Sequence, residues 1–253
     1  LRVYTADNVL IGEFGQERRD FVPIAETPAV LKNALLSIED ARFYSHGGVD
    51  FIGLARAFSG GLREGASTIT MQVARNFYLT QERTVTRKLR EALLTYRIED
   101  ALAKDQILEL YMNQIYLGQR SYGFSSAART YFGKTLPELS LAQAAMLAGV
   151  PKNPLRHNPA VNFERAKQRQ VVVLKSMLRN DYITQAQFDQ ASAERITLQD
   201  GPSVGAHGAY VAEMVRQSVF AQHGEATYTM GLKVVTTINQ AEQLAAYESV
   251  RRN

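Results

Sequence analysis

Two carboxylates and a group of basic side chains are the residues of this sequence best suited to chemistry. Glu39 follows an apolar stripe at the predicted C-terminal end of a helix. Burial and the negative end of the helix dipole both favour the protonated form of its carboxyl group and raise its pKa. Such a carboxylate suits a general base that works near neutral pH. The alternative is a solvated pair of acids, Glu39 and Asp40, at the end of the helix.

Glu91 has basic neighbours on its own predicted helix. Arg87 and Lys88 precede it by four and three residues, and these separations bring side chains together on a helix surface. Their charges favour the ionised form of Glu91. With Arg75 they could grip a diphosphate, because a guanidinium offers a fork of donors and an ammonium offers a point charge. The alternative is a surface ion-pair cluster that contributes little to stability.

Smaller polar residues could complete such a site. Ser67, Thr68 and Thr70 lie at the predicted start of a helix and could offer donors to an anion, although N-capping explains Ser67 equally well. His46, in a glycine-rich turn, is either a substrate contact or a turn residue. Phe43 is more typical of packing than of sugar stacking. These residues alone indicate a phosphate-handling enzyme without naming its substrate.

Helices must position most of these side chains. The first predicted helix has Thr27 as its N-cap and Pro28 as its first residue, and its apolar spacing brings it to an end near Glu39. The next starts near Ser67 and carries a polar face. A third surrounds Glu91, with these residues expected to face inward: Leu89, Leu93, Leu94, Ile98 and Leu102. Further helices are predicted from Asp105, from Ser140 to Gly149, and over 162–179, 184–195 and 210–222, with capping boxes at Ser140/Gln143 and Thr184/Gln187.

Short strands are predicted only near the ends. Residues 1–14 alternate loosely around a turn at Asp7-Asn8, which indicates a hairpin or an extended arm. Residues 232–238 form a β-branched run that needs a sheet partner which this chain hardly supplies. The stretch 199–208 has the composition of a linker. The sequence therefore predicts a mainly α fold with short β segments at the N- and C-termini.

Composition excludes several classes of protein. The 253 residues carry a formal charge of +4 with a pI near 9.2, which favours anionic partners without naming any. Cysteine is absent and the histidines lack metal-ligand spacing, so no protein metal site is predicted. No run approaches the roughly 20 apolar residues of a membrane span. Because the chain begins at Leu1 rather than Met, we expect a trimmed chain whose signal or anchor preceded it.

Five stretches of the chain match a known set of signatures in order. They are Glu39 to Asp50, Gly65 to Gln72, Arg87 to Glu91, Ile107 to Gly118 and Leu147 to Lys152. Together they resemble the signatures of the peptidoglycan glycosyltransferases, the lysozyme-like domain of class A, bifunctional penicillin-binding proteins of the 1A type. The resemblance covers about residues 22–193. Ala66 and Met71 replace the more usual Gly and Gln of the second signature, which we expect to tune the site without abolishing its function.

The resemblance implies the polymerisation of lipid II, an undecaprenyl-diphosphate-linked disaccharide-pentapeptide, into β-1,4-linked glycan strands with inversion. Glu39 would take the proton of the acceptor's 4-hydroxyl group as this oxygen attacks the anomeric carbon of the growing chain. Glu91 would organise the diphosphate leaving group, helped by the basic residues Arg75, Arg87 and Lys88. A divalent cation, Mg²⁺ or Mn²⁺, at the diphosphate is the cofactor candidate. By analogy with inverting glycosidases, Glu39 and Glu91 should lie more than about 5.5 Å apart.

The same resemblance assigns a larger set of side chains to substrate binding. The expected set is Asp40, Phe43, His46, Ser67, Thr68, Thr70, Gln72, Arg75, Asn76, Arg87, Lys88, Asn113 and Lys152. Phe43, His46, Thr68, Gln72 and Asn76 match positions that line the family's cleft. The segment 51–62 matches a jaw that faces the bilayer in the family, and its alternative is an ordinary packed helix.

The resemblance also predicts how the chain is organised. Residues 1–198, with an N-terminal arm over 1–21, would form the glycosyltransferase domain, and 199–253 would be a linker and the start of a transpeptidase region. The Ser-x-x-Lys motif of such a region is absent from this sequence, so acylation by β-lactams is not expected. The domain would act at the extracytoplasmic, periplasmic face of the bacterial cytoplasmic membrane. Its expected partners are lipid II, the growing glycan strand, the membrane surface and cell-wall synthesis regulators, with no nucleic acid.

Two other functions remain open at this point. A glycan-cleaving lysozyme or lytic transglycosylase needs a catalytic Glu but no diphosphate grip, so the basic cluster around Glu91 argues against it. A non-enzymatic anion-binding module would not need the carboxylate of Glu39. Loss of polymerisation on neutralising Glu39 would separate an enzyme from such a module.

Overall fold

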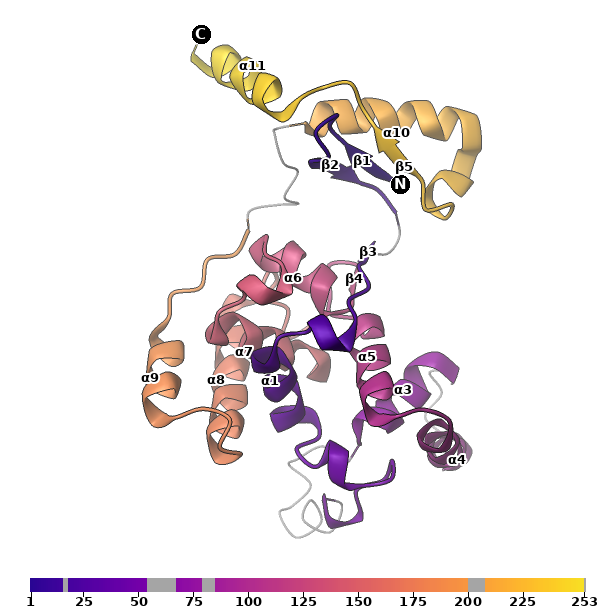
Figure 1. The fold of residues 1–253 in the computed structure, drawn as a ribbon, viewed down its shortest axis with the longest axis vertical. Coiled ribbons are helices and arrows are strands. Elements are labelled where there is room, and N and C mark those ends of the chain that lie inside the picture. Colours follow the sequence, from indigo (N-terminus) through magenta and orange to yellow (C-terminus); the bar gives the residue numbers. More distant parts are fainter. Residues whose placement is uncertain (16–17, 54–66, 79–84, 200–207, 253) are drawn as a thin grey trace. The chain divides into compact units, whose positions relative to one another are not determined.

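The computed structural model describes residues 1–15, 18–53, 67–78, 85–199 and 208–252 (Figure 1). They divide into two compact units. The larger unit is Arg19–Leu198, and the smaller one combines Leu1–Arg18 with Gln199–Asn253. The candidate site residues all belong to the larger unit.

The core of the larger unit is built around a helix of small residues, α7 (Leu141–Gly149). Every residue from Ala142 to Gly149 is buried. Its alanines take little space, which lets α1 (Ala29–Glu39) and α8 (Phe163–Arg179) pack directly against it. The predicted capping box is confirmed, because the Ser140 hydroxyl accepts a hydrogen bond from the backbone N–H of Gln143.

The end of α1 is held in place by α8. The hydroxyl of Ser176 donates to the backbone carbonyl of Ser37 at 2.6 Å, which gives a partner to one of the last carbonyls of the helix. At its start, α1 has Pro28 as its N-cap and not Thr27, which ends the preceding 3₁₀ turn. Proline has no N–H to donate, so it costs nothing at this position. The predicted end of the helix at Glu39 is confirmed.

A second layer consists of α3 (Ile69–Tyr78), α4 (Val85–Ala101) and α5 (Lys104–Gln114), with α3 packed against both others. One expectation for α4 is wrong, because Leu93 is 67% exposed. A helix turns by about 100° per residue, so Leu93 lies opposite to Glu91 and Ile98, which are buried. Glu91 therefore faces the interior and is not part of a surface cluster.

Shorter elements complete the larger unit. Two strands at its edge, β3 (Arg18–Arg19) and β4 (Ser121–Tyr122), pair with each other. The remaining helices are α6 (Phe124–Phe132) and α9 (Gln185–Ala193), and the 3₁₀ turns are Ile24–Glu26, Phe43–Ser45, Leu136–Glu138 and Val150–Lys152.

The smaller unit contains a three-stranded sheet covered by α10 (Ala209–His223). The predicted hairpin is confirmed, because β1 (Arg2–Tyr4) and β2 (Leu10–Glu13) are antiparallel around a turn in which Asn8 has a φ of 62°. β5 (Lys233–Val235) runs parallel to β1. A Cβ atom added to Gly12 on β2 would lie 2.4 Å from the Cβ of Ala212, so glycine permits this close approach of α10. A 3₁₀ turn (Gly224–Tyr228) and α11 (Gln240–Arg252) complete the unit.

This sheet changes two expectations. The β-branched run at 232–238 does have a partner within the chain, namely β1 at its other end. The sequence grouped the arm with 19–198, whereas in the structure 1–18 forms one compact unit with 199–253. The two compact units meet in the sequence at Arg18/Arg19 and at Leu198/Gln199.

Asn113 fastens the start of the larger unit to α5. Its amide oxygen accepts from the backbone N–H of Val22 at 2.8 Å, and its amide nitrogen donates to the carbonyls of Val22 and Glu109, both at 2.9 Å. Glu109 adds a hydrogen bond from the N–H of Ile24 at 2.7 Å. Asn113 was expected to bind substrate, but in the structure its amide group is occupied by the backbone.

We therefore expect Asn113→Ala to destabilise the larger unit. The substitution leaves the N–H and the carbonyl of Val22 without their side-chain partner, which costs about 2 kcal/mol of the free energy of unfolding. Urea denaturation measures this loss. Asn180→Ala, which removes one bond of an exposed asparagine, serves as the control and should cost less. Equal stability of the two variants would contradict the role of Asn113.

Candidate active site

The centre of the candidate site is the carboxylate of Glu39, the last residue of α1. Gln72 on α3 donates a hydrogen bond from its amide nitrogen to Oε2 of Glu39 at 2.8 Å. Burial raises the pKa of Glu39, while the Gln72 bond and the positive charges of Arg169, Lys152 and Arg75 oppose the rise. The net direction is upward, as predicted from the sequence. A base with a raised pKa therefore lies among cationic side chains.

A buried tyrosine orients the amide of Gln72. The hydroxyl of Tyr111 on α5 donates to the side-chain oxygen of Gln72 at 3.1 Å. Burial, and then the charge of Glu39, raise the pKa of Tyr111 well above its ordinary value, so the hydroxyl keeps its proton. Because the tyrosine fixes the oxygen end of the amide, the nitrogen end must face Glu39. Tyr111 is thus a positioning residue that acts through Gln72.

Asp40 joins the end of α1 to the start of α3. The carboxylate of this buried residue accepts from the backbone N–H of Ile69 at 3.1 Å and contacts Nε2 of His46 at 2.9 Å. An acid at this position suits the positive end of the α3 dipole. Asp40 and His46 were expected to bind substrate; in the structure they contact each other, and Asp40 links the end of α1 to the start of α3.

Thr68 and Thr70, the two threonines of the second signature, form hydrogen bonds within the protein. The hydroxyl oxygen of Thr68 accepts from the N–H of Met71 at 3.2 Å, so Thr68 and not Ser67 caps α3. Thr70 is fully buried and donates to Glu99 Oε1 at 2.5 Å. The same carboxylate oxygen accepts from Lys104 at 2.8 Å.

Phe43 packs in the core near this network. It is 1% exposed, and the ammonium of Lys104 lies 4.4 Å from the centre of its ring. The interpretation of Phe43 as a packing residue fits this position better than a place on the cleft surface. Asn76 on α3 is exposed, whereas Ser67 is partly buried.

Glu91 on α4 forms the second acidic position. Its side chain is fully buried, and its Oε1 accepts from Lys88 at 2.9 Å. Arg75, which the sequence grouped with this cluster, exerts its charge on Glu39. The side chain of Arg87 lies outside what the structure describes, and so does most of the segment 51–62. The described part of that segment includes Phe51 and Ile52, which are 67% and 62% exposed.

Comparison with known proteins decides the family. The family model for transglycosylases matches residues 7–178, which is more than half of the chain. The chain belongs to the transglycosylase family. The expected family, the mainly α fold and the enzyme class, a peptidoglycan glycosyltransferase, are thereby confirmed.

Relatives of this transglycosylase are longer proteins. It is 52% identical to penicillin-binding protein 1A of Neisseria flavescens and 46% identical to penicillin-binding protein 1A of Escherichia coli (strain K12). These matches cover 100% of this chain but 32% and 30% of the relatives, so the chain spans about a third of their length. The crystal structure of penicillin-binding protein 1A from Haemophilus influenzae is 34% identical, with a TM-score of 0.55 over 99% of this chain and 28% of that one.

None of the described helices of the transglycosylase has the length and hydropathy needed to span a bilayer.

Sequence reasoning missed two residues near the base of the transglycosylase. Tyr111 lies in an apolar stripe of α5, a position typical of core packing. Arg169 lies on α8 among many charged residues, which resembles a solvated face. The spacing of apolar residues along α8 could have indicated this position. Arg169 shares the buried face with Ala166, three residues before it, and Val173, four residues after it. A Cβ atom added to Gly149 would lie 2.8 Å from Cγ of Arg169, so glycine at the end of α7 makes room for this arginine.

We expect Tyr111→Phe to change the pH profile of the transglycosylase. Without the tyrosine hydroxyl, the Gln72 amide is free to turn, and its hydrogen bond to the Glu39 carboxylate weakens. That bond favours the charged form, so the pKa of Glu39 rises further and the acidic limb of the rate profile moves to higher pH. The rate at neutral pH should fall about tenfold, equivalent to roughly 1.4 kcal/mol.

Tyr131→Phe is the matched control for this experiment. Its hydroxyl is also buried and donates to the backbone carbonyl of Leu117 at 2.6 Å. This change should lower stability without moving the acidic limb. An acidic limb that moves equally in both variants would show that Tyr111 contributes only to folding.

Proposed function

We propose that this chain polymerises lipid II into β-1,4-linked glycan strands by inverting transfer, with release of undecaprenyl diphosphate. The observation that carries the proposal is the carboxylate of Glu39, which has a raised pKa, an oriented hydrogen-bond donor and cationic neighbours. A glycan-cleaving enzyme would not need those cations. A substrate with a diphosphate would, because phosphate oxygens bind guanidinium and ammonium groups.

Glu39 acts as the general base in this proposal. Its carboxylate removes the proton from the 4-hydroxyl of the acceptor sugar, and the freed electron pair forms the new bond to the anomeric carbon of the growing chain. The opposing effects on the pKa of Glu39 suit this role. Burial makes the carboxylate more basic, while the charges of Arg169, Lys152 and Arg75 keep the ionised form accessible near neutral pH.

The leaving group departs with the electrons of the bond to the anomeric carbon. We assign its stabilisation to the cluster on α4, where Lys88 is paired with the buried Glu91. Arg87 on the same helix and Arg75 on α3 would add positive charge. Cations fixed at this point act most strongly as the negative charge of the diphosphate develops.

A Mg²⁺ or Mn²⁺ ion remains the cofactor candidate of this proposal. Among the described residues, no group of three or more His, Asp and Glu side chains could hold a metal ion. The described side chains alone therefore do not fit a protein-bound metal. Any such ion would have to be held mainly by the diphosphate oxygens of the substrate, as Mg²⁺ commonly is.

The proposal extends to the surroundings of the domain. Its substrate is a lipid, so we place it at the periplasmic face of the cytoplasmic membrane, with the growing glycan strand and cell-wall synthesis regulators as further partners. The exposed Phe51 and Ile52 support contact with a lipid surface, because large apolar side chains favour the interfacial region.

Glu39→Gln tests the proposal. The amide cannot take up the proton, so polymerisation of labelled lipid II should fall by about 100-fold or more. Polymer separated on a gel is the readout, and a thermal melt checks the fold. The pH dependence of the unmodified chain follows in sign: the rate falls as the pH drops through the raised pKa of Glu39, because the protonated carboxyl group cannot accept a proton.

Glu138→Gln makes the same change at an exposed carboxylate and should leave the rate unaltered. Undiminished polymerisation by a folded Glu39→Gln variant would exclude Glu39 as the base. Shortening of preformed glycan without any polymer would favour the cleaving enzyme instead.

A further inference from the structure

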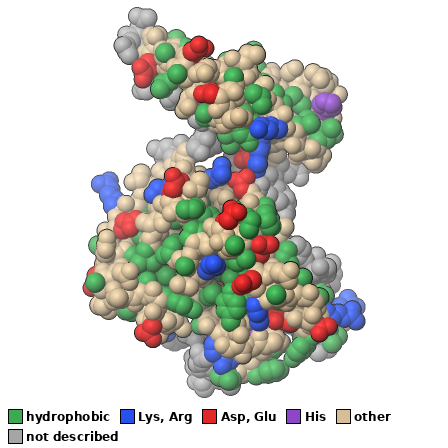
Figure 2. Space-filling model, in the orientation of Figure 1, with side chains coloured by type: hydrophobic (Ala, Val, Ile, Leu, Met, Phe, Trp, Pro, Cys, Tyr) green, Lys and Arg blue, Asp and Glu red, His purple; other side chains and the backbone are tan. Residues whose placement is uncertain are grey.

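A largely buried ion pair, Glu99–Lys104, joins α3, α4 and α5 of the larger unit. Its carboxylate and ammonium groups are 2.8 Å apart, and the two side chains are 11% and 21% exposed. On the face of the larger unit shown in Figure 2, by contrast, acidic and basic side chains are interspersed at the surface, where single pairs contribute little. Removing two charges from water costs free energy, so a buried pair adds little net stability. Its contacts therefore indicate what else it does.

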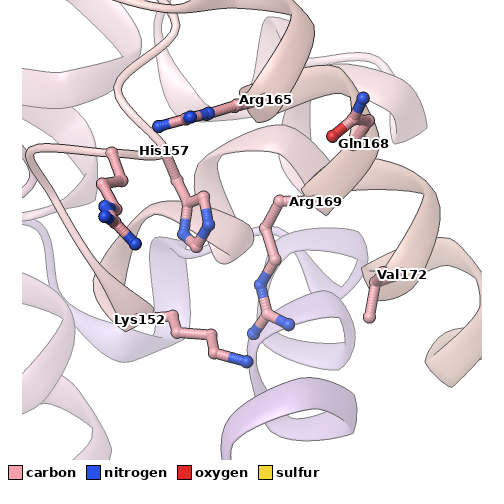
Figure 3. A pocket seen from close by; sticks show the side chains of 7 residues that line it. Lys152, His157, Arg165, Gln168, Arg169 and Val172 are labelled. Carbon is pink, nitrogen blue, oxygen red and sulfur yellow. The ribbon is translucent and has the colours of Figure 1, made fainter.

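The ion pair is distinct from the pocket beside α8 that Figure 3 shows. Lys152 and Arg169 line that pocket, and their charges already belong to the surroundings of Glu39. Glu99 and Lys104 do not line the pocket, and their charges are not among the causes that shift the pKa of Glu39. An effect of the pair on the base must therefore pass through the side chains that it contacts.

The first turn of α3 is held by two carboxylates. Glu99 accepts a hydrogen bond from the hydroxyl of Thr70 at 2.5 Å, and Asp40 accepts from the backbone N–H of Ile69 at 3.1 Å. Thr70 is fully buried, and its one hydroxyl proton is taken by Glu99. Gln72 follows two residues later on the same helix. The position of this turn consequently decides how the Gln72 amide meets the base.

Glu99 and Lys104 also pack against the segment that follows the base in the sequence. Gly48 has a φ of 85°, and a Cβ atom added to it would lie 2.6 Å from Cγ2 of Thr95 and 3.0 Å from Cγ of Glu99. The ammonium of Lys104 lies 4.4 Å from the centre of the Phe43 ring. The turn between Phe43 and Gly48 thus rests on the end of α4 and the start of α5.

The same helix that carries Glu99 also carries the second acidic position of the site. Glu91, paired with Lys88, precedes Glu99 by eight residues on α4. At 1.5 Å per residue, the two carboxylates are separated by about 12 Å along the helix axis. A link between Glu99 and α3 therefore fixes how far α4 can slide along α3. Reacting groups held by different helices need such a link, because a shift of about 1 Å can slow a reaction about 100-fold.

We propose that Glu99 is a positioning residue for the transfer reaction, which acts through Thr70 to hold the Gln72 amide against Glu39 and to keep α4 in register with α3. The inference rests on the proposed function for the role of Glu39, and it extends that function to a residue outside the five signatures. Thr70 was expected to bind substrate, and under this proposal its hydroxyl is the link to Glu99.

Thr70→Val is the sharpest test, because it removes the linking hydroxyl and leaves the Glu99–Lys104 pair in place. The first turn of α3 loses one of its two carboxylate partners, so the hydrogen bond from Gln72 to Glu39 weakens. The pKa of Glu39 should then rise by roughly half a unit or more, because that bond favours the ionised form. The kcat for lipid II at neutral pH should fall about tenfold while KM changes less than about twofold.

Glu99→Ala removes the acceptor of the same hydrogen bond and should raise the pKa of Glu39 in the same direction. If both variants break one link, the double substitution Thr70→Val/Glu99→Ala should move the pKa no further than Glu99→Ala alone. Glu99→Ala leaves Lys104 without its carboxylate, so a variant that does not fold is possible there, and Thr70→Val then decides the question alone.

Glu109→Ala is the control for a loss of stability without a loss of positioning. Its carboxylate also makes a structural hydrogen bond, from the backbone N–H of Ile24 at 2.7 Å. This variant should melt at a lower temperature with the kcat and the pKa of Glu39 unchanged. A folded Thr70→Val variant that behaves in the same way would overturn the proposal. A raised KM with unchanged kcat in Thr70→Val would assign its hydroxyl to the substrate and overturn it too.

NMR titration without substrate separates this inference from the proposed function. In a chain labelled with ¹³C at the glutamate carboxyl carbons, the signal of Glu39 is the one that Glu39→Gln removes, and its pH midpoint gives the pKa directly. A midpoint raised by Thr70→Val, in a chain that forms no polymer, would count against the proposed function alone. An unmoved midpoint in a chain that polymerises lipid II would count against the role of Glu99 alone.

Discussion

The carboxylate of Glu39 is partly withdrawn from water, and the surrounding structure compensates for that burial. One hydrogen bond from Gln72 and three positive charges oppose the rise of its pKa. These groups come from three parts of the chain: α3 supplies Gln72 and Arg75, the turn after α7 supplies Lys152, and α8 supplies Arg169. The helices of the larger unit must therefore pack correctly before the carboxylate acquires its properties.

The carboxylate of Glu39 is subject to two opposing effects. Lys152 and Arg169 favour the ionised form of the carboxylate. Burial acts in the opposite direction and raises the pKa of Glu39. The strength of this base therefore depends on both the packing and the charges around it.

Local sequence patterns predicted several of the helix boundaries in the larger unit. Apolar spacing located the end of α1 at Glu39, and the capping boxes at Ser140 and Thr184 mark true helix starts. These features depend on residues within one or two helical turns. The parallel pairing of β1 with β5 could not be predicted, because it joins distant parts of the chain. Leu93 was predicted to face inward and is exposed, although the helical period places it opposite to the buried Glu91 on α4.

For the candidate site, the sequence predicted some of the residues but not the groups that several of them bind. The motifs identified Glu39, Gln72 and Lys152. In the structure, Gln72 donates a hydrogen bond to Glu39, and the charge of Lys152 lowers the pKa of Glu39. They did not reveal that Thr70 and Asn113 bind other parts of the protein, because a polar residue in a motif looks the same whether its partner is a substrate or a backbone carbonyl. Arg169 escaped notice because its buried position depends on contact between α7 and α8.

The pairing of β1 with β5 also constrains the order in which the chain can fold. The hydroxyl of Thr236 donates to the carbonyl of Tyr4, and the two residues are 232 positions apart. During synthesis from the N-terminus, the first strands leave the ribosome long before their partner exists. The larger unit, whose helices come from 19–198, can fold in that interval because its contacts are complete earlier. The hairpin of β1 and β2 must stay unpaired on one edge until translation passes Val235, so this hairpin reaches its final structure only after the larger unit can have folded.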